Sequence, residues 1–220
     1  MATSKVIQIT LFIRQSQGKI IALIIYVDDM IVTGNDYDSM KYLASEFEMR
    51  KLRDLKYFLG IEVARSKHGI FLSQRKYILD LLYETGMLGC KPVNTPIEQN
   101  HKYFLCSSVA YTDKGRYQRL VGKLIYLSHT RPDIAYVVNV VSQFMHDPRK
   151  PHVDVVEGIL RYLKSTPGKG ILFSKYGHLR VEGYTDADWA GSTDDRRSTS
   201  GYFTFVGGNL VIWREVKNMW

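Results

Sequence analysis

Short apolar runs separated by polar residues dominate the first part of the chain. Residues 6–13 (VIQITLFI) and 20–27 (IIALIIYV) are rich in β-branched side chains and flank a polar segment around Gly18. A third run, MIVTG, follows Asp29. Apolar runs of this length with turn residues between them predict three β-strands, and the second and third form a tight hairpin with Asp28 and Asp29 at its tip.

Apolar residues after this hairpin recur with the spacing of one helix face. The pattern from Met40 to Phe47 predicts an amphipathic helix capped by Asn35 or Asp36. Residues 56–64 and 69–74 predict a second hairpin, and a helix that ends at Gly86 follows it. The stretch 89–116 contains prolines and few periodic apolar positions, so we expect a long connection there.

Three further helices and three strands are predicted in the rest of the chain. The segments TRPD and DPRKP separate the helices, whose apolar faces comprise Tyr117, Leu120, Val121, Leu124 and Leu127, then Ile134, Val137, Val138, Val141 and Met145, and finally Val156, Ile159, Leu160 and Leu163. From residue 171 the apolar period changes to two. Strands are expected at 179–187, 200–206 and 210–213, the last two joined by a GGN turn.

The adjacent acids Asp28 and Asp29 stand out because their neighbours are almost all apolar. A buried carboxylate is costly unless it is paired, hydrogen-bonded or bound to a cation. Phosphoryl transfer with two metal ions needs carboxylates that are gathered within a few ångströms, and Mg²⁺ prefers oxygen ligands. The pair therefore indicates metal-dependent chemistry on phosphates; the alternative is an acidic turn between two ordinary strands.

Composition and charge indicate the partner and the cellular compartment in which this chemistry would take place. The 30 Lys and Arg against 22 Asp and Glu leave a net charge of +8, which favours a polyanionic partner such as nucleic acid. The 2 cysteines indicate neither a zinc site nor a disulfide framework, so we expect a reducing compartment, cytoplasmic or nuclear. No apolar run reaches the roughly 18–20 residues that span a bilayer, and neither a membrane partner nor organellar targeting is expected.

The segment LIIYVDDMIVTGND resembles the catalytic hairpin of reverse transcriptases from copia-type LTR retrotransposons. Other segments resemble that family in the same order: LRDLKYFLGIEV, GIFLSQRKYILDLL, YQRLVGKLIYLSHTRPDIAY, VSQFMHDPRKPH, ILRYLKSTPGKG, YTDADWAGSTDDRRSTSGY and FVGGNLVIW. Because the series spans nearly the whole chain, the sequence is identified as a member of the copia-type Pol polyprotein family.

This resemblance implies roles for residues of the polymerase. Asp28 and Asp29 would be catalytic carboxylates of the palm and metal ligands for Mg²⁺ or Mn²⁺, and Tyr26 would lie beneath the primer terminus. Phe58, Leu59 and Gly60 would form a hairpin that contacts the primer; without the family, a β-bulge at Gly60 is an equally good interpretation.

The resemblance also implies nucleic-acid contacts and a second site. Template–primer phosphates would be neutralised by basic residues of the helices, namely Lys76, Arg119, Lys123, Arg131, Arg161 and Lys164. For each of them a solvated helical face is the alternative. Asp186 would be a catalytic and metal-binding carboxylate of ribonuclease H, with Asp188 as its competitor on the same strand face.

The expected fold class is α+β. Residues 1–88 would be the C-terminal part of a reverse transcriptase palm with the start of the thumb, 89–170 a helical thumb and connection, and 171–220 the N-terminal strands of a ribonuclease H-like β-meander. The expected partners are an RNA–DNA hybrid or template–primer, and other Pol fragments.

Departures from the family pattern bear on activity. The sequence has no block of the type D-V-x-x-A-F-L-x-G, which carries the third palm aspartate in the family, and no later ribonuclease H carboxylates, so we expect a piece truncated at both ends. Since loss of one ligand from a two-metal site costs orders of magnitude in rate, the isolated chain is expected to be inactive. The alternatives are a non-catalytic nucleic-acid-binding module and a transposon relic without function.

Overall fold

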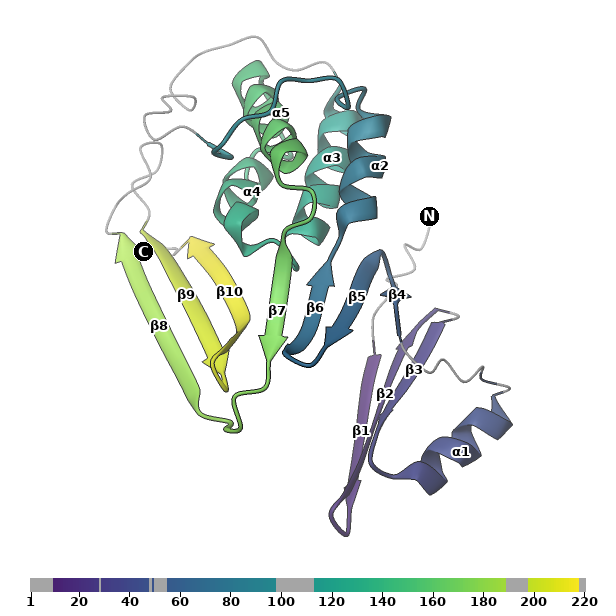
Figure 1. Ribbon diagram of the computed structural model, residues 1–220. Helices are drawn as coiled ribbons and strands as arrows, with labels where there is room; N and C mark the ends of the chain where they lie inside the picture. The colour runs from purple at the N-terminus through teal and green to yellow at the C-terminus, as the bar shows by residue number, and fades with distance from the viewer. Residues whose placement is uncertain are drawn as a thin grey trace, which may run out of the picture. The chain divides into compact units, whose positions relative to one another are not determined.

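The computed structural model describes residues 10–27, 29–47, 49, 55–97, 113–188 and 198–217 (Figure 1). These residues form a mixed α/β protein with three antiparallel sheets and five α-helices. The chain divides into two compact units, residues 1–54 and 55–220, which are described in turn.

The first unit is a three-stranded meander followed by one helix. Its elements are β1 (Thr10–Ser16), β2 (Lys19–Tyr26), β3 (Asp29–Gly34) and α1 (Tyr37–Glu46). The β-branched residues of β2 pair on both sides, with β1 and with β3. Helix α1 begins where the Asp36 side chain accepts hydrogen bonds from the backbone N–H and the hydroxyl of Ser39, at 3.3 and 2.7 Å. These bonds hold the pKa of Asp36 below its ordinary value.

The second unit contains a four-stranded sheet, a group of helices and a second meander (Figure 1). Its elements are β4 (Tyr57–Phe58), β5 (Ile61–Ser66), β6 (Gly69–Ser73), α2 (Arg75–Glu84), α3 (Lys114–Leu127), η1 (Pro132–Ile134), α4 (Ala135–Ser142), α5 (Lys150–Ser165), β7 (Gly170–Ser174), β8 (Val181–Asp188), β9 (Thr199–Val206) and β10 (Asn209–Lys217). Strand β7 returns after the helices and pairs with β6, so the sheet order is β4-β5-β6-β7.

The helices of this unit share one hydrophobic core. Figure 1 shows α2, α3, α4 and α5 gathered into one group. Side chains with at most 2% of their surface exposed come from all four helices and from η1, and they are Ile78, Leu81, Leu82, Tyr117, Val121, Leu124, Leu127, Ile134, Val137, Val138, Val141, Val156, Ile159, Leu160 and Leu163. Burial of these apolar stripes is the main stabilisation of the fold.

The meander β8–β9–β10 is attached to the helices and to the four-stranded sheet by two polar side chains. The Trp213 indole N–H donates to the Ser128 carbonyl at 2.9 Å, at the end of α3. The Asn209 amide accepts from the Ser174 N–H at 2.6 Å and donates to the Ser174 carbonyl at 3.0 Å, as a neighbouring strand would. The meander and the helical group are therefore parts of one unit.

The structure confirms most predicted elements and defines several of them more closely. Asp36, and not Asn35, caps α1. The TRPD segment starts a short 3₁₀ helix with Pro132 in its first turn. The strand predicted over 56–64 is interrupted at Leu59–Gly60 by a turn, so β4 folds back on β5. The strand predicted at 6–13 is seen as Thr10–Ser16, and residues 1–9 lie outside the described part of the chain.

Within the described ranges, no helix is both long enough and apolar enough to cross a membrane.

Candidate functional site

The tip of the β2–β3 hairpin presents the first candidate site. Tyr26 ends β2 and pairs with Asp29, which begins β3 and has an exposed side chain. Val27 lies in the turn with φ 52°, and 60% of its surface is exposed. A β-branched residue in the left-handed region costs about 1–3 kcal/mol, and such residues are found in tight turns and at active sites. Asp28 is the next residue and lies outside the described part.

The other end of the same hairpin is fixed by Asn35. Its side-chain oxygen accepts from the Ile20 N–H at 2.6 Å, and its amide donates to the Gly18 carbonyl at 3.3 Å. A Cβ atom at Gly34 would lie 2.1 Å from the Ile20 carbonyl oxygen, so only glycine fits there. A slip of one residue between the strands would move every side chain to the opposite face. This anchor therefore fixes the register that places Asp29 opposite Tyr26.

The chemistry of Asp28 and Asp29 fits a divalent cation of the Mg²⁺ type. Adjacent carboxylates at a tight turn offer the hard oxygen ligands that Mg²⁺ prefers, and the exposure of Asp29 leaves room for water and phosphate oxygens. Among the described residues, no group of three or more His, Cys, Asp and Glu side chains could hold a metal ion. Of the pair Asp28 and Asp29, the structure describes the carboxylate of Asp29.

The second candidate region is the tight turn at Leu59 and Gly60, called here the Leu59–Gly60 turn. Both residues have positive φ, 50° and 80°, and the flanking pair is Phe58 with Ile61. The turn replaces the β-bulge that was the alternative for Gly60. The Tyr126 hydroxyl, from α3, donates a hydrogen bond to the Leu59 carbonyl.

Aromatic and amide side chains of the helices lie against this turn. The Tyr77 and Tyr126 rings meet edge to face, with centroids 5.5 Å apart. Gln74 is fully buried; its side-chain oxygen accepts from the Thr130 hydroxyl at 2.8 Å, and its amide nitrogen has no hydrogen-bond partner in the described structure. Burial raises the pKa of Tyr77 to about 12, with smaller contributions from Tyr126 and Glu84. Tyr77 is therefore a neutral hydrogen-bonding group at physiological pH.

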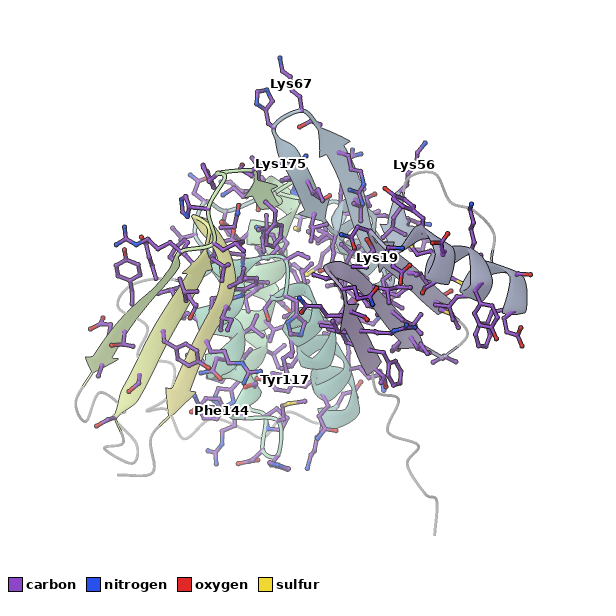
Figure 2. The ribbon with its side chains drawn as sticks, turned by 90° about the horizontal axis from the view of Figure 1, so that it is seen from below. Lys19, Lys56, Lys67, Tyr117, Phe144 and Lys175 are labelled. Atoms are coloured by element: carbon purple, nitrogen blue, oxygen red, sulfur yellow. The ribbon has the colours of Figure 1, made fainter. Side chains whose placement is uncertain are left out.

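The predicted phosphate-binding residues differ in their surroundings. Arg119 is exposed on α3, whereas Lys123, one helical turn later, forms an ion pair with Glu84 of α2. Arg131 is buried, with 1% of its surface exposed, so the prediction that it contacts phosphate is wrong. Other lysines project into solvent, as Figure 2 shows for Lys67 at the tip of the β5–β6 hairpin.

Lys76 is exposed on α2, and the other basic and acidic candidates have the following surroundings. Arg161 lies 3.7 Å from Glu157 on α5, and Lys164 donates hydrogen bonds to the carbonyls of Leu88 and Cys90. Asp186 lies on β8, exposed and opposite Gly201. Asp188 ends β8, and its side chain lies outside the described part of the chain.

Several residues of these regions had no clear signal in the sequence. Asn35 was a candidate helix cap, and its bonds to Ile20 reach back 15 residues. Tyr126 lies beside the apolar stripe of α3, and its partner Leu59 is 67 residues away. An aromatic residue with a polar tip next to a buried stripe is the only hint that such a contact exists.

The structure and its candidate site define a mixed α/β protein with an exposed carboxylate at a strained hairpin tip, and comparison with known proteins identifies its family. The model of the family described as "Reverse transcriptase (RNA-dependent DNA polymerase)" matches residues 3–99. The retrovirus-related Pol polyprotein from transposon RE1 of Arabidopsis thaliana is 44% identical over 212 residues, which cover 94% of this chain and 14% of that protein.

Two shorter relatives match over most of their own length. An uncharacterized mitochondrial protein of Arabidopsis thaliana is 41% identical over 195 residues, covering 87% of this chain and 81% of that protein. A putative transposon Ty5-1 protein of Saccharomyces cerevisiae is 32% identical over 213 residues, covering 94% and 69%. No solved structure matches the chain.

The chain belongs to the reverse transcriptase family found in retrotransposon Pol polyproteins. The resemblance noted from its sequence is thereby confirmed. The chain spans only 14% of the length of the RE1 polyprotein, so the activity of that whole protein does not pass to it directly.

Proposed function

We propose that this chain is part of a copia-type, RNA-directed DNA polymerase that acts on a template–primer. The observation that carries the proposal is the hairpin tip, where a strained turn at Val27 precedes two adjacent acids and the exposed Asp29 lies opposite Tyr26. A two-residue hairpin turn requires positive φ, which Gly, Asn or Asp adopts with little strain. A β-branched residue in that position, beside two carboxylates, therefore favours a functional origin of the turn. Membership of the reverse transcriptase family supports the same interpretation.

Each candidate residue has a role in this proposal. Asp28 and Asp29 would hold a divalent metal ion, Mg²⁺ or Mn²⁺, which supplies charge neutralisation for phosphate oxygens when it is bound. Tyr26 would support the primer terminus, and the Leu59–Gly60 turn would approach the primer backbone closely. Arg119 would neutralise a phosphate from its exposed position on α3.

Two further parts of the proposal concern the helices and the last strands. The helices after β6 would form the thumb and connection, and strands β8 to β10 would be the beginning of a ribonuclease H-like domain in which Asp186 or Asp188 is a metal ligand. The meander order β10-β9-β8 and the exposure of Asp186 on β8 support this part.

Primer extension tests the polymerase assignment. The 220 residues include two of the three carboxylates that the family pattern requires, so with Mg²⁺ or Mn²⁺ they should not extend a DNA primer on an RNA template by themselves. Addition of a second polypeptide that carries the D-V-x-x-A-F-L-x-G block within its folded domain should restore primer extension. Asp29→Asn in the present chain should abolish the restored extension. Asp80→Asn, at an exposed carboxylate on α2, is the matched control and should have no effect.

Two results would contradict the proposal in different ways. Extension by the chain alone, abolished by Asp29→Asn, would refute its inactivity. Failure of the complemented protein to extend, although both polypeptides are folded and associated, would refute the polymerase role.

Salt-dependent binding tests the contact with nucleic acid. Arg119→Gln should reduce the slope of log K against log salt for an RNA–DNA duplex by about 1, because one phosphate contact is lost. Lys123→Gln should change the slope less, because Lys123 is already paired with Glu84. Equal slopes for Arg119→Gln and the unsubstituted chain would exclude Arg119 from the interface.

A further inference from the structure

The Leu59–Gly60 turn has a conformation that its own sequence does not favour. Leu59 adopts φ 50°, a region that non-glycine residues rarely occupy, whereas Gly60 tolerates its φ of 80° without cost. A leucine stays in that region only when the surrounding structure holds it there.

The pairing of β4 with β5 and a contact from the end of α3 provide this restraint. The Tyr126 hydroxyl donates to the Leu59 carbonyl, across 67 residues of sequence, and thereby fixes the orientation of the Leu59–Gly60 peptide. Gly60 rests on the same side chains, since a Cβ atom there would lie 3.6 Å from the Tyr77 ring and 3.8 Å from the Tyr126 ring. Beyond the strand pairing, the turn is thus held by one hydrogen bond from α3 and supported by two aromatic rings.

The Tyr126 side chain has little freedom to release the turn. Its ring meets Tyr77 of α2 edge to face, with an interplanar angle of 67°. Gln74, at the start of α2, is fully buried and bound to the Thr130 hydroxyl beyond the end of α3. These contacts join the beginning of α2 to the end of α3, directly behind the turn.

We infer that Tyr126 is a positioning residue, which sets the conformation of the Leu59–Gly60 turn for contact with the primer. This inference rests on the proposed function, because it takes the turn to be a primer contact. Tyr126 acts through the Leu59 carbonyl and not on nucleic acid. Because Arg119 lies on the same helix, α3 would bind the duplex and hold the turn as a single rigid element.

Hydrogen exchange of the full chain tests the positioning role without any ligand. Tyr126→Phe removes only the hydroxyl and keeps the ring contact with Tyr77. Amide exchange in a peptide covering 57–63 should then become about fivefold faster, as expected for loss of one hydrogen bond. A peptide covering 78–82 in the core of α2 should be unchanged. The matched control is Tyr83→Phe, at a tyrosine of α2 with 75% of its surface exposed.

Either of two exchange results would overturn the inference. Unchanged exchange at 57–63 would mean that the Tyr126 hydroxyl does not hold the turn. Faster exchange at both 57–63 and 78–82 would mean that Tyr126 has a general structural role and not a role confined to the turn.

Photo-crosslinking separates failure of the inference from failure of the proposed function. The probe is an RNA template annealed to a DNA primer that carries 4-thiothymidine at its 3′ end. The unsubstituted chain should crosslink within residues 57–63. In Tyr126→Phe this adduct should fall at least about threefold, while overall affinity stays within about twofold because the phosphate contacts remain. Equal adduct in both chains refutes the role of Tyr126; no adduct at the turn in the unsubstituted chain refutes the primer contact itself.

Discussion

Substitution of Asp133 tests how the helical group of the second unit is held together. Arg131 has 1% of its side chain exposed and donates two hydrogen bonds to the Asp133 carboxylate, at 2.9 and 2.8 Å. Its other two bonds go to the Thr166 carbonyl and hydroxyl, at 2.9 and 2.8 Å. The Tyr162 hydroxyl also donates to Asp133, at 2.7 Å. Asp133→Ala would therefore leave a buried guanidinium with half of its bonds.

The cost follows from the geometry of this pair. Removal of one partner from a buried ion pair costs about 3–5 kcal/mol, and we expect about 3 kcal/mol because 31% of the Asp133 side chain is exposed to water. The double variant Arg131→Met with Asp133→Ala should lose less than the sum of the single variants, since no unpaired charge remains buried.

The pH dependence of this stabilisation has a defined sign. Burial opposes ionisation of Asp133, but hydrogen bonds from Arg131 and Tyr162 outweigh it and hold its pKa below the ordinary value. A carboxyl group whose pKa falls on folding binds protons more readily in the unfolded chain. The contribution is thus fully present above about pH 4, the ordinary aspartate pKa, and is lost as the pH falls through the lower folded pKa.

Urea unfolding followed by tryptophan fluorescence measures the effect in this unit alone, because the 3 tryptophans are Trp189, Trp213 and Trp220. The free energy of unfolding of Asp133→Ala should differ from that of the unsubstituted chain by about 3 kcal/mol at pH 7 and by clearly less at pH 3. A difference below about 1 kcal/mol at pH 7, or equal differences at the two pH values, would refute this account of the pair.

Three other substitutions have expected outcomes that thermal unfolding can check. Gly34→Ala should lower the stability of the first unit by about 2 kcal/mol or more, because its Cβ would meet the Ile20 carbonyl oxygen at 2.1 Å and its φ is 147°; Gly122→Ala, in open space on α3, should instead stabilise the second unit by about 0.5–1 kcal/mol. A gain of stability in Gly34→Ala would contradict the first expectation, and a loss in Gly122→Ala the second. Tyr117→Phe should cost about 1–2 kcal/mol by leaving the Val141 carbonyl without its 2.7 Å bond. This loss should be constant from pH 6 to about pH 9, because burial raises the pKa of Tyr117 above its usual range near 10; a loss that disappears by pH 9 would contradict this.

The helices were predictable because their signals are local. On α3, Tyr117, Val121 and Leu124 recur on one face, and all three are buried. Residues that cannot continue a helix, such as Pro132, occur where the elements change. Such patterns depend on residues less than two turns apart, so the sequence contains them in full.

The candidate site was predictable only in part because its supporting contacts are distant in sequence. The pairing of Lys123 with Glu84 joins residues 39 positions apart, and the bond from Tyr126 to Leu59 joins residues 67 apart. No local pattern distinguishes Lys123 from the exposed Arg119, although their surroundings in the structure differ. The apolar run over 56–64 predicted one strand because the turn at Leu59 depends on a tertiary contact, which overrides local preference.

The end of α3 connects more of the second unit than any sequence pattern indicates. Within residues 126–131, one side chain binds the Leu59 carbonyl, one backbone carbonyl accepts from Trp213 of β10, and two further side chains bind Gln74 and Thr166. These partners belong to the β4–β5 turn, the last meander and the ends of α2 and α5. Because the four contacts share six consecutive residues, substitutions at the two ends of this segment should not be additive in stability. A change that shifts the meander through Trp213 should therefore also disturb the turn at Leu59.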